Sequence, residues 1–125
     1  MDWSTYLNLA RELAERAGEL VGHEAEARQR SAVSRAYYAM YCTARDKLNI
    51  VGDFNPPCGS DHIYLWKVFA EEPYRSNSVR DLGQRLRGAR VQADYENFIS
   101  NLPHFVQGAI MDAEELQEAL DTLPL

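Results

Sequence analysis

Residues 30–48 constrain the fold of this chain more than any other stretch, because they are rich in small and aromatic residues yet carry arginines. At about 100° per residue, a helix through this stretch gathers its apolar residues on one broad stripe. That stripe consists of Val33, Ala36, Tyr37, Met40, Tyr41, Ala44 and Leu48. A second face consists of Ser31, Arg35, Tyr38, Ala39 and Cys42. Since the second face lacks the Glu and Lys of a solvated surface, we expect the central helix of a bundle, with Arg35 and Tyr38 facing a partner or a groove.

The other segments also predict helices, and no segment has the period-two alternation of a strand. The expected helices cover residues 2–22, residues 24–48 with a solvated start at 24–30, a short segment from Asp61, a segment from Ser76 or Ser78, and residues 104–123. The Pro56–Pro57 pair predicts that residues 49–60 form the longest loop. We therefore expect an all-α fold, an up-and-down bundle of four long helices plus one short helix.

Capping residues set the expected helix ends. Asp2 or Ser4 is expected to cap the first helix, and Gly22 to end it. Asp61 is expected to cap the short helix, and Asn101 to cap the last one ahead of Pro103.

The charge of the chain is unevenly distributed. Of its 125 residues, 46% are hydrophobic and 26% are charged, which suffices for a single domain over residues 1–125. Residues 1–90 hold all 13 Lys and Arg, whereas residues 91–125 hold seven acidic residues and no basic one. Such acidity argues against indiscriminate nucleic-acid binding, but a local basic site remains open because exposed charges are screened over about 10 Å.

We expect neither an export signal nor a metal site from the N-terminal residues and the cysteine spacing of this sequence. The N-terminus has neither a basic nor an apolar leader region, and no run of residues is apolar enough to span a membrane. Cys42 and Cys58 are too far apart for a zinc motif and are expected to be free thiols. We expect a cytoplasmic protein without a membrane segment, a metal or a cofactor.

The arginines offer the first candidate site. Arg87 and Arg90, together with Arg80 and Asp94, share one face of a predicted helix, and planar guanidinium groups suit phosphate recognition. The alternative is a surface pair of Arg90 with Asp94 at i,i+4. For Arg35 two readings stay open, a salt bridge to Asp94 from a neighbouring helix and a role in binding an anion.

Aromatic and titratable residues offer a second set. Tyr37 and Tyr41 are expected in the core, whereas Tyr38 fits either a core position or a site. His62 follows the predicted loop and could titrate near neutral pH, although a capping or surface position is the alternative. Cys42 is expected to be inert packing. The last helix carries acids at helical spacing that we expect on a solvated face, namely Asp112, Glu115 and Glu118.

Three segments, in this order and spacing, resemble the small prokaryotic HEPN-domain proteins. They are Ser34-Arg-Ala-Tyr-Tyr-Ala-Met-Tyr41, Asp61-His62 at the start of a short helix, and Arg90-Val-Gln-Ala-Asp-Tyr95. The resemblance covers roughly residues 5–120. It implies a four- to five-helix up-and-down bundle that forms a homodimer through its central helices.

The resemblance also implies a biological setting. HEPN proteins are often the toxin components of toxin–antitoxin or defence modules, encoded beside a small nucleotidyltransferase that acts as the antitoxin. Many are metal-independent endoribonucleases that use an arginine and a histidine four to six residues apart. This chain departs from that pattern, because Met40, Tyr41 and Cys42 occupy those positions after Arg35. Cys42 also stands where some relatives carry a tyrosine that the partner modifies.

Two hypotheses follow for the function. In the first, a groove at the dimer interface binds or cleaves RNA, with Arg35, His62 and Tyr38 as the catalytic set. Its RNA- or nucleotide-binding set is Arg35, Arg87, Arg90, Asp94 and Tyr95. In the second, the chain is a non-catalytic nucleotide- or partner-binding module with a structural Arg–Asp–Tyr network. Cleavage requires His62 within reach of the arginines, whereas a structural role predicts arginines saturated by Asp94 and tyrosine hydroxyls.

Overall fold

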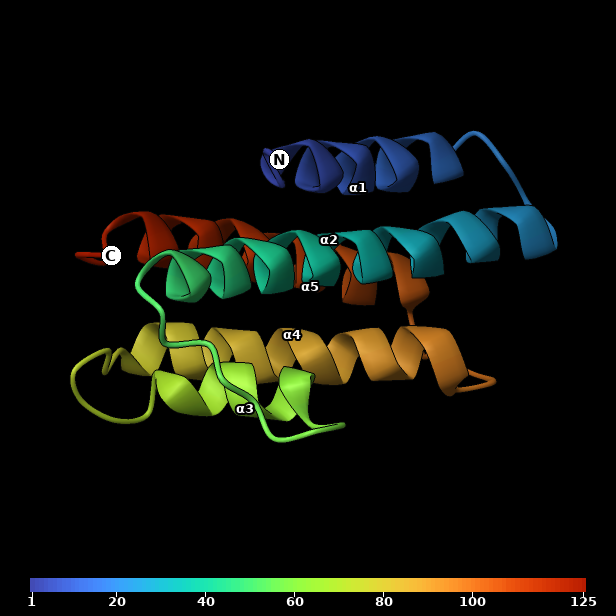
Figure 1. Cartoon of the computed structure of the whole chain (residues 1–125). Coiled ribbons are helices and arrows are strands. Elements are labelled where there is room, and N and C mark those ends of the chain that lie inside the picture. Colours follow the sequence, from blue (N-terminus) through green and yellow to red (C-terminus); the bar gives the residue numbers. More distant parts are fainter.

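A computed structural model describes all residues, 1–125, and contains five helices and no strand (Figure 1). The helices are α1 (Ser4–Ala17), α2 (Gly22–Ile50), α3 (Asp61–Val68), α4 (Asn77–Tyr95) and α5 (Leu102–Asp121). The prediction of an all-α fold with four long helices and one short helix is confirmed. The longest connection is residues 51–60, as the Pro56–Pro57 pair predicts.

Helix α2 is the central element, because it contacts each of the other four helices. Figure 1 shows α1 and α4 on opposite sides of α2 and α5, and α1 and α4 make no contact with each other. Helix α3 lies outside this group and packs mainly on α4. All seven residues of the apolar stripe predicted for α2 are buried, so the period of the hydrophobic residues did place this helix in the core.

The second face of α2 is only partly as predicted. Ser31, Arg35 and Tyr38 are exposed, but Ala39 and Cys42 are buried in the hydrophobic core. Because α1 packs along α2 more extensively than any other helix does, the buried part of α2 is wider than one stripe.

Several helix ends differ from the prediction. Gly18 rather than Gly22 follows α1, whereas Gly22 has a φ of 71° and begins α2. Asp61 is the first helical residue of α3, not its cap. Asn101 stands at the N-cap of α5 but makes no side-chain cap bond there. Ser76 does cap α4, since its hydroxyl accepts a hydrogen bond from the Val79 backbone N–H.

Close packing of α3 on α4 depends on one glycine. A Cβ atom added at Gly83 would lie 2.1 Å from the Trp66 ring, so only glycine lets the indole lie against α4 at this point. None of the five helices combines the length and the apolar character needed to cross a membrane.

Candidate functional site

His62 meets the three tyrosines of α2. Its Nδ1 lies 2.8 Å from the hydroxyl oxygen of Tyr37. Its ring stacks on Tyr41, with centroids 4.1 Å apart and planes at 23°, and meets Tyr38 edge-on at 5.8 Å. The position of His62 in the first turn of α3, directly after the 51–60 loop, carries the imidazole to α2. The histidine is therefore half-buried among aromatic rings and is not a loose surface residue.

Arg90 brings α4 to the same place. Its Nη2 donates a 2.9 Å hydrogen bond to the Tyr38 hydroxyl, and its guanidinium lies 5.2 Å from the centre of the Tyr38 ring. Its Nε lies 2.9 Å from Asp94, although the Nε–H is not aimed at the carboxylate. Asp94 also accepts a 2.5 Å hydrogen bond from Ser34. Arg90, Asp94 and Tyr38 thus form an Arg–Asp–Tyr network, and the i,i+4 pair is half-buried rather than on a wet surface.

Arg35 is not part of this network. It is exposed on α2 and makes no ion pair or side-chain hydrogen bond within the chain. The Arg35–Asp94 salt bridge, one of the two readings for Arg35, is not formed within the chain, and the Asp94 carboxylate contacts Arg90 and Ser34 instead. Arg87 is half-buried and also unpaired, and it lies close enough for its charge to act on His62. Two guanidinium groups beside the network therefore carry uncompensated charge.

We call the contacting residues the α2–α3–α4 cluster; they are Ser34, Tyr37, Tyr38, Tyr41, His62, Arg90 and Asp94. The cluster contains His62, Tyr38, Arg90 and Asp94 from the sequence-derived site. Tyr95, at the end of α4, is 72% exposed and forms no hydrogen bond or ring contact with the cluster. Arg80 pairs with its neighbour Asp81 instead.

The acidic residues of the last helix lie on the surface, as expected. Asp112 forms a two-bond ion pair with Arg85, while Glu115 and Glu118 are exposed. Cys42 is buried, and burial raises the pKa of its thiol, which disfavours the reactive thiolate.

The surroundings of His62 lower its pKa. Burial is the main cause, the positive charges of Arg90 and Arg87 add to it, and Asp61 opposes it. Burial likewise raises the pKa of Tyr37, so this phenol keeps its proton at neutral pH. His62 is therefore neutral around pH 7.

This shift predicts a pH dependence of stability. A histidine whose folded pKa is depressed stabilises the fold above its unfolded value of about 6.5, and the contribution is lost as the pH falls below that value. We expect urea unfolding to show a steeper loss of stability between pH 7.5 and 5.5 in the wild type than in His62→Gln. His104→Gln, which changes an exposed histidine, is the control and should retain the wild-type slope. An equal slope in His62→Gln would contradict the shift.

Sequence reasoning missed Trp66 and Ser34 as supporting residues. The Trp66 indole N–H donates to the Tyr37 hydroxyl at 3.3 Å, and Ser34 holds Asp94. One signal was available: Gly83 interrupts a helix that otherwise favours larger residues, which is typical of a close approach by a bulky neighbour.

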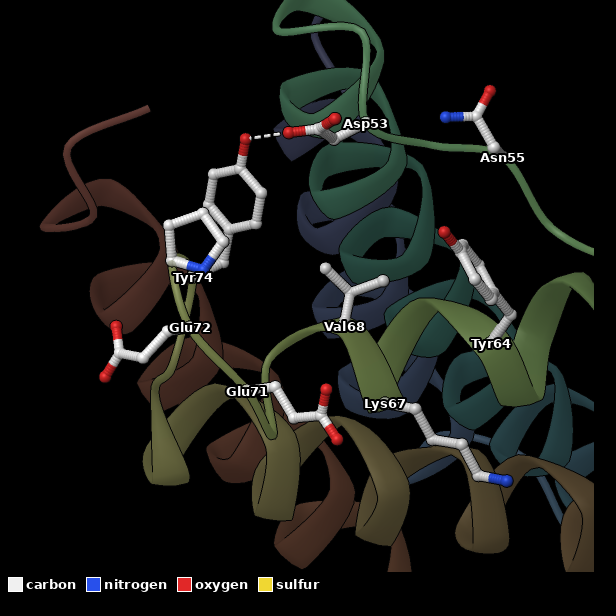
Figure 2. Close-up of a pocket in the computed structure, with 9 residues that line it drawn as sticks. Asp53, Asn55, Tyr64, Lys67, Val68, Glu71, Glu72 and Tyr74 are labelled. Carbon is white, nitrogen blue, oxygen red and sulfur yellow. Dashed lines mark hydrogen bonds between the residues drawn. The ribbon is translucent and has the colours of Figure 1, made fainter.

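A separate pocket lies on the other side of α3. Figure 2 shows its lining residues, which enclose about 450 Å³ and include none of the cluster. The Tyr74 hydroxyl donates a hydrogen bond to Asp53 at its edge. That bond, together with the edge contact of Phe54 with Tyr64, ties the 51–60 loop to the α3 side of the fold.

Comparison of the chain with protein-family models, with curated proteins and with solved structures found no match. The Asp94 carboxylate of the cluster is paired with Arg90 and Ser34. The accessible Tyr38 ring and the neighbouring unpaired guanidinium groups of Arg35 and Arg87 suit an anion that also carries a flat apolar surface.

Proposed function

We propose that this chain is a HEPN-like protein, with the up-and-down arrangement of that family, which binds RNA through the α2–α3–α4 cluster. The observation that carries the proposal is the convergence of His62, Tyr38 and Arg90. Unpaired Arg87 lies near His62, and unpaired Arg35 precedes Tyr38 by about one turn of α2. Cations that follow a phosphate backbone and an aromatic ring that can stack on a base are the usual means of binding single strands.

The charge of Arg35 and Arg87 matters more for binding than that of Arg90. Arg90 already has Asp94 and the Tyr38 hydroxyl as partners, so its donors are partly used. Arg35 and Arg87 have none within the chain, and the chain is otherwise acidic, with a net charge of −6. In this proposal they contact phosphates, Tyr38 stacks on a base, and Arg90 with Asp94 holds Tyr38 in place.

We expect the double substitution Arg35→Gln/Arg87→Gln to weaken binding to a labelled single-stranded RNA at least about tenfold, because two charge-assisted contacts are lost. Fluorescence anisotropy over a series of salt concentrations is the measurement. The slope of log affinity against log salt should become shallower by about 1.4, as expected for two fewer phosphates on a single strand.

The matched control is Arg16→Gln/Arg75→Gln, which removes the same charge from exposed residues that pair with Glu12 and Glu72. This control should bind almost as the wild type does. Equal weakening in both double variants would mean that binding follows net charge alone, and the cluster would then not be the site.

Metal-independent cleavage of RNA is the second candidate, favoured by the contact of His62 with Tyr38 next to Arg90. Binding remains the better supported function, because Nδ1 of His62 is occupied by Tyr37 and the residues at the usual histidine spacing after Arg35 are Met40, Tyr41 and Cys42. The same RNA samples, kept in EDTA and run on a gel, separate the two. Discrete fragments that disappear in His62→Ala would establish the nuclease.

We also propose that two copies associate along the exposed face of α2 at Ser31, so that Arg35 and Tyr38 of each copy line the groove between them and stay open to RNA. Light scattering after gel filtration should give a dimer mass for the wild type and a monomer mass for Ser31→Glu, because a buried charge opposes association. Asn8→Glu on the exposed side of α1 is the control and should remain a dimer. A monomeric wild type would disprove this interface.

The nucleotidyltransferase-type antitoxin is a proposed partner that rests on the resemblance alone.

A further inference from the structure

A buried chain of hydrogen bonds runs from α3 through α2 and back to α3. The Trp66 indole N–H lies 3.3 Å from the Tyr37 hydroxyl oxygen, which lies 2.8 Å from Nδ1 of His62. Trp66 and Tyr37 are completely buried. Water therefore cannot replace either partner, and the direction of each bond follows from what each group can donate.

The direction of these bonds determines where the His62 proton lies. An indole N–H can only donate, so Tyr37 accepts from Trp66. The Tyr37 hydroxyl proton is then buried with one acceptor within reach, Nδ1 of His62, and an unpaired buried donor would be costly. Tyr37 thus donates to Nδ1, and in the neutral imidazole the proton lies on Nε2.

The other nitrogen of His62 is left for a ligand. No partner within the chain binds Nε2, and the two ring nitrogens of an imidazole point in widely different directions, so Nε2 points away from the buried hydroxyl. Tyr41 stacks on the ring and limits its rotation. The charged groups that act on the imidazole are Arg87, Arg90 and Asp61, and the two arginines disfavour a charged histidine.

We infer that Tyr37 and Trp66 are positioning residues that fix His62 as a neutral Nε2–H donor, which contacts a phosphate oxygen of the bound RNA. This inference rests on the proposed function for the identity of the ligand. It assigns His62 to binding, since a nitrogen that carries the proton cannot accept one from an attacking hydroxyl.

The inference has a spectroscopic test on the full chain without ligand. Long-range ¹H–¹⁵N correlation spectra at pH 7.5 should show His62 with a protonated Nε2 and an unprotonated, hydrogen-bonded Nδ1. In Tyr37→Phe the donor is removed, and the two ¹⁵N shifts should move toward each other as both tautomers become populated. Tyr41→Phe keeps the stacking ring and the Tyr37 bond, so it should retain the wild-type spectrum.

The wild-type spectrum by itself can overturn the inference, so the test remains decisive even if a variant does not fold. A protonated Nδ1 in the wild type, or a tautomer unchanged in folded Tyr37→Phe, would show that Tyr37 does not set the proton. Trp66→Phe provides an independent arm, in which loss of the incoming N–H should also mix the tautomers.

Binding measured at two pH values separates this inference from the proposed function. An RNA affinity that stays within about twofold between pH 6.5 and 8 supports a neutral donor. A loss of affinity of tenfold or more as the pH rises from 6.5 to 8, absent in His62→Gln, would show that a charged histidine binds the phosphate and would overturn the inference. If RNA does not bind while Nε2 carries the proton, the proposed function and the phosphate contact fail, and the positioning by Tyr37 stands.

Discussion

Replacing Gly83 by alanine is expected to lower the free energy of unfolding by about 2–3 kcal/mol, although alanine is the better helix former by about 1 kcal/mol. The added methyl group would lie 2.1 Å from a ring carbon of Trp66, which is fully buried. Neither α4 nor the indole can yield without opening the contact between α3 and α4. Urea unfolding followed by circular dichroism is the measurement.

Gly88→Ala is the matched control, because Gly88 lies in the same helix and a Cβ there meets nothing within 4 Å. This change should raise the free energy of unfolding by about 0.5–1 kcal/mol. Opposite signs for two identical substitutions five residues apart would establish the close approach of Trp66. The same sign in both would show that the indole does not lie against α4.

The effect of Gly83→Ala should extend to the site. A displaced Trp66 can no longer donate to Tyr37, and Tyr37 in turn holds His62. The spectrum of His62 should therefore change in any folded Gly83→Ala protein, while it should stay unchanged in Gly88→Ala. A glycine on α4 would thus affect a histidine on α3 through the packing of Trp66 and the two hydrogen bonds that join Trp66 to His62.

Local sequence patterns predicted most of the helices but not their ends. The buried stripe of α2 repeats every three to four residues, and its burial follows from that period. The end of α1 was wrong by several residues, because Gly18 and Gly22 are equally plausible stops in sequence. Gly22 does adopt a positive φ, but as the first residue of α2, after the connection that follows α1.

The sequence singled out part of the cluster but did not predict how its members meet. His62, Tyr38 and Arg90 were each singled out by residue type, whereas their convergence depends on how α3 packs on α2 and α4. The Arg35–Asp94 bridge is not formed within the chain; on α2 it is Ser34, the residue before Arg35, that meets the Asp94 carboxylate. Long-range packing supplied the part that spacing along the chain could not.

Arg30 is another residue whose contacts could not be predicted from its position in the sequence, and these contacts stabilise the fold. Residues 24–30 were predicted to be solvated, but the Arg30 side chain forms hydrogen bonds with the C-terminal end of α4. Its Nη1 donates to the backbone carbonyl oxygens of Ala93 and Glu96 at 2.9 and 2.7 Å, and its Nη2 donates to that of Asn97 at 3.2 Å. The last carbonyls of a helix lack partners within it and carry partial negative charge, so a cation is favoured there.

We expect Arg30→Met to lower the free energy of unfolding by about 2 kcal/mol, because several charge-assisted hydrogen bonds are lost while the apolar stem is kept. Arg28→Met is the control on the same helix. Arg28 pairs only with Glu24 on an exposed surface and should change the stability by less than about 0.5 kcal/mol.

Hydrogen exchange distinguishes this explanation from a general loss of packing. Without Arg30, the last turn of α4 should open locally. The backbone amides near Ala93 should then exchange faster than they do in the wild type, whereas the exchange rates near Leu82 should change less. Faster exchange spread evenly over α4 would mean that Arg30 acts on the whole bundle. Because Asp94 lies in that last turn and holds Arg90, a frayed end should also loosen Tyr38 and weaken RNA binding. The fold and the proposed site are thus joined at the C-terminal end of α4.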